Sequence, residues 1–191
     1  MPTPTPFDPS PTVAHSIVRG TAASLGPLLL CTDGAALTAV VFSAQPDSSG
    51  DLADFAIDPS LVGCADEQHP VLTRATHQLL QYVAGQRQVF DVPLRAHGTP
   101  FQKRVWDELL RIPYGHTIRY QDLAQRIGQP TASRAVGLAN GRNPLAIVIP
   151  CHRVIGASGQ LTGYGGGLPR KRWLLDLEAR QAGPLLSFAW P

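Results

Sequence analysis

An apolar run that ends at a proline, directly before a cysteine and a histidine, constrains this chain more than any other feature of its sequence. Residues 145–149 read Leu-Ala-Ile-Val-Ile, and Pro150, Cys151 and His152 follow. A run of this length that stops at a proline predicts a buried strand or extended segment. The fold must therefore deliver the Cys151 thiol at the end of a rigid segment, with an imidazole next to it in the chain.

The residues around Cys151 also predict a nucleophilic site. A thiol attacks efficiently only as the thiolate. His152 can remove the thiol proton, and the positive charge of Arg153 favours the resulting anion. A buried, inert cysteine beside an uninvolved histidine is the alternative that these residues alone leave open.

A third group of this site is predicted in the last helix, residues 169–182. Residues of alternating charge recur every four positions and predict its solvent face: Arg172, Asp176 and Arg180. Glu178 instead aligns with Leu174 on the apolar face, where a carboxylate needs a partner. Glu178 either pairs with an arginine or orients His152, directly or through a water.

The fold class predicted for the chain is α+β. Residues 13–97 predict a small α/β domain with an antiparallel sheet, in which strands at 28–31 and 37–42 flank an Asp-Gly turn. Helical spacing marks residues 71–83, and residues 89–94 predict a further strand.

Residues 98–191 predict a second, mostly helical domain. A helix begins at Thr99-Pro100, with the threonine as its cap. Residues 121–127 predict a second helix, and a third follows a cap at either Thr131 or Ser133. Two helices joined by a short turn that contains glycine predict a winged helix-turn-helix-like element that binds DNA.

Charge is distributed unevenly between the two halves. Residues 98–191 carry twelve Lys or Arg and five Asp or Glu, a balance of +7, whereas residues 1–97 carry four and nine, a balance of −5. A basic half indicates contact with a polyanion, although a chance imbalance of a solvated surface is the alternative. Residues 1–12 hold five prolines and predict a disordered or polyproline-like tail.

The cysteines indicate the compartment. The chain has three cysteines, Cys31, Cys64 and Cys151. This odd number and the irregular spacing argue against a disulfide framework and for a reducing, cytoplasmic location. Cys31 and Cys64 with His69 and His77 match no common zinc spacing, so no metal is predicted. No apolar run approaches a membrane span, and the N-terminus lacks the pattern of a secretory signal.

The C-terminal half resembles the O6-alkylguanine-DNA alkyltransferases, also called methylated-DNA–protein-cysteine methyltransferases. The resemblance rests on the Pro-Cys-His-Arg-Val motif and covers about residues 98–180. It extends to the following residues: Phe101, Gly115, Tyr120, Leu123-Ala124, Arg134-Ala135-Val136-Gly137, Asn143-Pro144, Ser158-Gly159, Tyr164-Gly165-Gly166-Gly167 and Trp173-Leu174-Leu175.

The resemblance implies a DNA repair protein that acts once, as a monomer and without a cofactor. It would bind duplex DNA, rotate the damaged base out of the stack, and transfer the alkyl group of O6-alkylguanine, and of O4-alkylthymine, irreversibly to Cys151. The implied catalytic residues are Cys151, His152, Glu178 and Tyr120. The implied DNA or base contacts are Arg134, Ala135, Gly137, Asn143, Arg153, Val154, Tyr164 and Gly165.

Some of these roles are specific. Arg134 would fill the vacated space in the stack, Asn143 would brace the turn before the active-site segment, and Tyr120 would protonate the leaving guanine, unless it is only a packing tyrosine. Gly165 departs from the family, in which many relatives carry a serine that contacts guanine O6.

Other functions remain open at this point. A cysteine hydrolase would use the glycine-rich loop at 163–167 as an oxyanion hole. A relative that only recognises the lesion would lack the nucleophile, and Cys151 argues against it. A transcriptional regulator of this family would carry further N-terminal domains.

Overall fold

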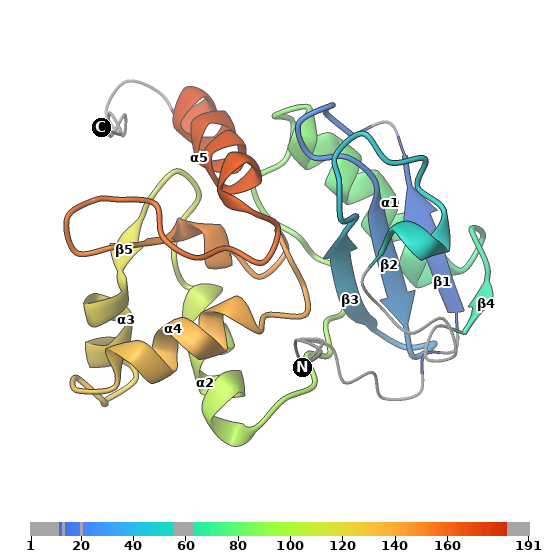
Figure 1. Cartoon of the computed structure of the whole chain (residues 1–191). Coiled ribbons are helices and arrows are strands. Elements are labelled where there is room, and N and C mark those ends of the chain that lie inside the picture. Colours follow the sequence, from blue (N-terminus) through green and yellow to red (C-terminus); the bar gives the residue numbers. More distant parts are fainter. Residues whose placement is uncertain (1–11, 13, 20, 56–62, 183–191) are drawn as a thin grey trace. The chain divides into compact units, whose positions relative to one another are not determined.

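The computed structural model describes Thr12 and residues 14–19, 21–55 and 63–182, which form two compact units (Figure 1). The first unit ends at His97 but also includes Pro144–Val148, and the second holds the remaining described residues. The sequence interpretation assigned Pro144–Val148 to the second domain. In the structure Val40 of the first unit exchanges backbone hydrogen bonds with this segment. Most of the proline-rich tail predicted at 1–12 lies outside the described residues.

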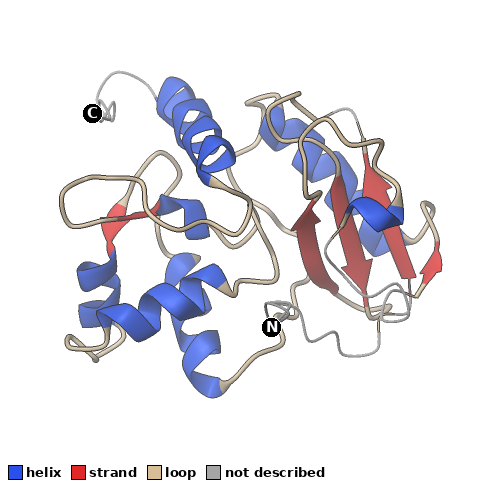
Figure 2. Ribbon diagram, viewed as in Figure 1, coloured by secondary structure: helices blue, strands red, loops and turns tan. Residues whose placement is uncertain are grey.

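The first unit is built on a four-stranded sheet in the order β3-β2-β1-β4 (Figure 2). β1 (Ala14–Val18), β2 (Leu28–Thr32) and β3 (Leu37–Phe42) are antiparallel, which confirms the predicted hairpin. β4 (Cys64–Ala65) pairs with β1 in parallel, so the sheet is mixed at this edge. Two residues are too few to show a period-2 pattern, so the sequence does not reveal β4.

Both faces of this sheet are covered, as the burial of β2 along its whole length shows. Leu29 and Cys31 of β2 point to one face, where they pack near Phe55, which follows the 3₁₀ helix η1 (Leu52–Asp54). Leu28 and Leu30 alternate to the other face. The helix α1 (Pro70–Val83) packs along the sheet and confirms the helix predicted at 71–83 (Figure 1).

The strand predicted at residues 89–94 is wrong. Leu94 makes a single bridge to Leu37, and Val89 is 72% exposed. Pro93 has no N–H and therefore interrupts a strand ladder.

The run at residues 145–149 is largely buried, as predicted, but it is not a regular strand. Leu145 bridges Val40, and Ile147 then takes a positive φ of 70°. The N–H of Val148 donates to the Ala146 carbonyl over 2.8 Å, which closes a γ-turn around Ile147. A positive φ is strained for a β-branched residue, so apolar periodicity gives no sign of this turn.

The second unit is mostly helical. Its helices are α2 (Pro100–Leu109), α3 (Tyr120–Arg126), α4 (Ser133–Gly141) and α5 (Leu168–Ala182). β5 (Ile118–Arg119) and β6 (Val154–Ile155) form a short parallel pair. Thr99 caps α2 as predicted, with its hydroxyl accepting from the Gln102 N–H at 3.3 Å.

α3 and α4 form the predicted helix-turn-helix, with Gly128 at a φ of 73° in the turn. The predicted cap at Thr131 or Ser133 is wrong, because Ala132 occupies the cap position without a side-chain bond and Ser133 is already helical. α2 packs against α4, and the Trp106 indole N–H donates to the Ala139 carbonyl over 2.9 Å.

Replacing Trp106 with phenylalanine removes the buried indole N–H, so the Ala139 carbonyl loses this hydrogen bond. We expect the free energy of unfolding, measured by urea denaturation, to fall by about 2 kcal/mol. Trp173→Phe, on the partly buried face of α5, is the matched control. Equal losses in both variants would contradict a role for the indole hydrogen bond.

Candidate active site

Cys151 begins a short 3₁₀ helix, η3 (Cys151–Arg153), directly after a second tight turn. Pro150 has φ −81° and ψ 62°, and the Cys151 N–H donates to the Ile149 carbonyl over 2.8 Å. These dihedrals are those of an inverse γ-turn, which suits the fixed φ of proline. The turn and η3 together place three consecutive side chains, Cys151, His152 and Arg153, inside the second unit.

Asn143 holds the thiol in place. Its Nδ2 donates to the Ile149 carbonyl at 2.8 Å and to Cys151 Sγ at 3.1 Å. Asn140 on α4 donates to the Cys151 carbonyl at 3.3 Å. Burial raises the pKa of the Cys151 thiol, whereas the Asn143 hydrogen bond and the Lys171 charge lower it. Since burial dominates, the resting group is a protonated thiol that needs a base.

Glu178 is almost completely buried, and it links its own helix, α5, to η3 and to the loop that contains Gly115. Its Oε1 accepts from His152 Nε2 at 2.8 Å, and Arg153 donates to both carboxylate oxygens at 2.8–3.1 Å. Its Oε2 also accepts from the Gly115 N–H at 2.9 Å. Burial opposes ionisation of Glu178, yet His152 and Arg153 hold its pKa below the usual range.

His152 is poised as a neutral base. Burial lowers its pKa, and the charge of Glu178 opposes this shift. A carboxylate at Nε2 favours the tautomer with the proton on that nitrogen, so Nδ1 carries the lone pair. The structure therefore realises the direct contact between Glu178 and His152, and it adds the ion pair with Arg153 that the sequence left as an alternative.

Arg153 does not lie where the resemblance implied. It is 6% exposed, and its Nη1 donates to the Ile112 carbonyl at 2.6 Å while its other nitrogens bind Glu178. These contacts commit its guanidinium to the interior, so the predicted DNA contact of Arg153 is corrected to an internal ion pair.

Lys171 is a functional candidate that the sequence interpretation missed. It is fully buried on α5, and its Nζ donates to the Val154 carbonyl at 2.6 Å and to the Thr162 carbonyl at 2.8 Å. Burial lowers its pKa to about 8, and the charge that Cys151 carries as a thiolate opposes this shift. Lys171 is seven residues before Glu178, so both lie on the same, inward face of the helix. A charged residue on that face is the sequence signal that could have identified Lys171, as it identified Glu178.

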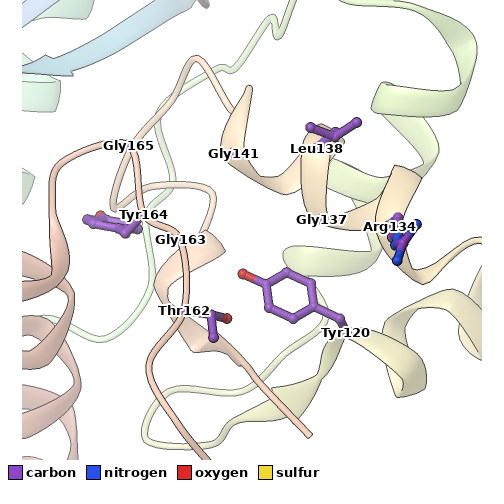
Figure 3. A pocket seen from close by; sticks show the side chains of 9 residues that line it. All are labelled: Tyr120, Arg134, Gly137, Leu138, Gly141, Thr162, Gly163, Tyr164 and Gly165. Atoms are coloured by element: carbon purple, nitrogen blue, oxygen red, sulfur yellow. The ribbon is translucent and has the colours of Figure 1, made fainter.

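A cavity of about 540 Å³ opens beside this cluster (Figure 3). Its walls come from Tyr120, from the exposed face of α4 and from the loop at 162–165. The lining residues are Tyr120, Arg134, Gly137, Leu138, Gly141, Thr162, Gly163, Tyr164 and Gly165. Figure 3 shows the Tyr120 hydroxyl directed toward this loop.

Cys151 lies close enough to two cavity residues to influence their ionisation. Burial raises the pKa of Tyr120 and of Tyr164, and the charge that Cys151 carries as a thiolate raises both further. The Tyr120 ring also lies 6.0 Å from Lys171 Nζ. Two of the residues that line the cavity, Tyr120 and Tyr164, therefore lie near the thiol, although Cys151 itself is not a lining residue.

Two other predicted DNA contacts lie on or beside this cavity wall. Gly137 faces the Tyr120 ring, since a Cβ there would lie 3.8 Å from it. A Cβ at Gly165 would lie 3.7 Å from the Gly141 carbonyl oxygen, an ordinary contact, so the position has room for a Cβ. Ala135 is exposed on α4 but is not one of the residues that line the cavity.

Neither a metal cluster nor a membrane helix is found in the described part of the chain. Within residues 14–19, 21–55 and 63–182, three His, Cys, Asp or Glu side chains nowhere gather to hold a metal ion. No helix among these residues is both long and apolar enough to span a membrane.

Comparison with known proteins assigns the chain to a family. Residues 100–180 match the model of the "6-O-methylguanine DNA methyltransferase, DNA binding domain", and residues 17–96 match that of the "6-O-methylguanine DNA methyltransferase, ribonuclease-like domain". The chain belongs to the 6-O-methylguanine DNA methyltransferase family. The predicted resemblance is confirmed, and it extends to the N-terminal half.

Several members of this family are closely similar in sequence and structure. The methylated-DNA–protein-cysteine methyltransferase of Mycobacterium leprae is 49% identical over 157 residues, which cover 82% of this chain and 88% of that protein. The crystal structure of the Mycobacterium tuberculosis O6-methylguanine methyltransferase has a TM-score of 0.75 at 45% identity, covering 89% and 94% of the two chains. A complex of the M. tuberculosis protein with DNA has a TM-score of 0.73 at 44% identity, covering 88% and 94%.

The lowered pKa of His152 predicts how stability depends on pH. Below pH 6.5 His152 is protonated in the unfolded chain but stays neutral in the folded chain. The free energy of unfolding therefore falls as pH falls from 6.5 toward 5. The lowered pKa of Glu178 acts in the same direction below about pH 4.5.

Urea denaturation at pH 7.5, 6.5 and 5.5 tests this expectation. His152→Gln should flatten the slope between pH 6.5 and 5.5, whereas His116→Gln, at an exposed histidine, should keep it. An unchanged slope in His152→Gln would show that another group causes the dependence.

Proposed function

We propose that this chain repairs DNA by transferring the alkyl group of O6-alkylguanine in duplex DNA to Cys151. The observation that carries the proposal is a buried thiol held by Asn143 and followed directly in the chain by a neutral histidine that a carboxylate orients. Family membership supports the same reaction, because the similar mycobacterial proteins are named for it.

His152 removes the thiol proton in this mechanism, directly or through a water. Glu178 keeps the proton on Nε2 and stabilises the imidazolium that forms. The N–H group of Asn143 and the charge of Lys171 stabilise the thiolate as it develops. A protonated resting thiol therefore becomes a nucleophile only at the moment of reaction.

The transfer itself is a displacement at carbon. The sulfur lone pair forms the S–C bond while the C–O6 bond breaks and its electrons remain on guanine. Tyr120, which lines the cavity, donates a proton to the leaving guanine. The product is a thioether without a good leaving group, so each chain reacts once and needs no cofactor.

Access to the alkyl carbon requires the damaged nucleotide to leave the duplex and enter the cavity. Arg134 lies exposed on α4 at the cavity edge, where it replaces the extruded base in the stack. Tyr164 walls the alkyl group, and the Val154 carbonyl accepts from the guanine amino group while it binds Lys171. O4-alkylthymine, which is smaller, is a second substrate of the same cavity.

We place the reaction in the cytoplasm, because the mechanism requires a reduced Cys151. One chain supplies every group of the proposed site, which supports action as a monomer. The exposed face of α4, with its small residues, contacts the minor groove.

Intact-mass measurement with peptide mapping tests the proposed transfer. After incubation with duplex DNA that contains O6-methylguanine, we expect one added CH2 per chain, located on Cys151 and absent in Cys151→Ala. Tight lesion binding without a mass gain would indicate a recognition module instead. Continuous turnover of an ester substrate would indicate a hydrolase.

Glu178→Gln tests how His152 is activated. The variant keeps the shape of the side chain but removes its charge, and we expect the single-turnover rate at pH 7 to fall by about 10²–10⁴-fold. The rate should recover partly at high pH, where the thiol ionises without a base. A uniform loss at every pH, accompanied by unfolding in circular dichroism, would mean that Glu178 is only structural.

A further inference from the structure

The exposed face of α4 carries one large apolar side chain. At about 100° per residue, Arg134, Gly137, Leu138 and Gly141 fall on one side of the helix. The opposite side is buried and consists of Val136, Ala139 and Asn140. Leu138 is 66% exposed. It lies four residues after Arg134, and both residues line the cavity (Figure 3).

Leu138 differs from the other large apolar side chains that the described residues expose. Val89, Leu110 and Leu168 are also exposed, but none of them lines the cavity. Gly137 and Gly141 have no side chains, so on this face Leu138 and Arg134 reach farthest from the helix. Whatever α4 approaches therefore meets an isobutyl group beside a guanidinium.

We propose that Leu138 contacts the minor-groove edge of the base pair next to the extruded nucleotide and makes alkyl transfer sensitive to a guanine amino group there. This inference rests on the proposed function, which brings α4 to duplex DNA. Apolar wedges are a common way in which minor-groove proteins support an opened base step. Leu138 is thus a positioning residue for the extruded state and a determinant of sequence context.

The direction of the preference follows from groove chemistry. A G·C pair presents the guanine N2 amino donor in the minor groove, whereas an A·T pair presents only acceptors. Leucine has no acceptor, so an amino group pressed against it loses its water without replacement. A G·C neighbour therefore slows transfer, and removal of its amino group relieves the penalty.

Inosine provides a selective probe, because an inosine·cytosine pair lacks only the minor-groove amino group of G·C. Single-turnover rates are measured on duplexes whose O6-methylguanine is flanked by G·C or by inosine·cytosine pairs. The weaker pairing of inosine affects every variant alike. The comparison that matters is the inosine-to-guanine rate ratio of each protein.

We expect this ratio to be about fivefold larger for the unaltered protein than for Leu138→Ala. Leu110→Ala removes the same atoms from an exposed leucine outside the cavity wall and should keep the unaltered ratio.

Two results would overturn the inference. Equal ratios in the unaltered protein and Leu138→Ala would show that Leu138 does not sense the amino group. Absence of transfer from every substrate by the unaltered protein would overturn the proposed function itself, and this inference with it.

Discussion

The buried carboxylate of Glu178 is the interaction on which the rest of the second unit depends. A charge in the interior needs partners, and Glu178 finds them in His152, Arg153 and the Gly115 N–H. Arg153 in turn binds the Ile112 carbonyl. α5, η3 and the loop after α2 are therefore held by one network, and any shift of one of them leaves a buried charge without its partner.

Gly115 shows how tightly this network constrains the chain. Its φ is 75°, and a Cβ there would lie 2.6 Å from the Ala182 Cβ on α5. Glycine adopts this conformation without strain, and the lack of a Cβ lets the backbone approach the helix closely enough for its N–H to reach Glu178. The glycine is thus part of the apparatus that positions His152, although it touches neither the histidine nor the thiol.

The sequence predicts those features that periodicity and caps can reveal. The inward position of Glu178, the start of α2 at Thr99 and the hairpin of β2 and β3 all follow from local patterns. The γ-turns around Ile147 and Pro150 do not. Tertiary contacts impose the positive φ of Ile147 against local preference, and the fixed φ of Pro150 suits an extended segment as well as an inverse γ-turn. The commitment of Arg153 to Glu178 is equally hidden, since no spacing shows which side of a buried segment an arginine takes.

The state of Cys151 fits its proposed use as a nucleophile that reacts once. A permanently ionised, exposed thiolate would react with any electrophile or oxidant. Here the thiol is 5% exposed, and burial raises its pKa. His152 stays neutral because burial lowers its own pKa, so the base is available while the thiol remains protonated. Burial thus keeps the thiol protonated and the histidine neutral, and in the proposed mechanism the reaction begins only when a substrate in the cavity presents an alkyl carbon to the sulfur.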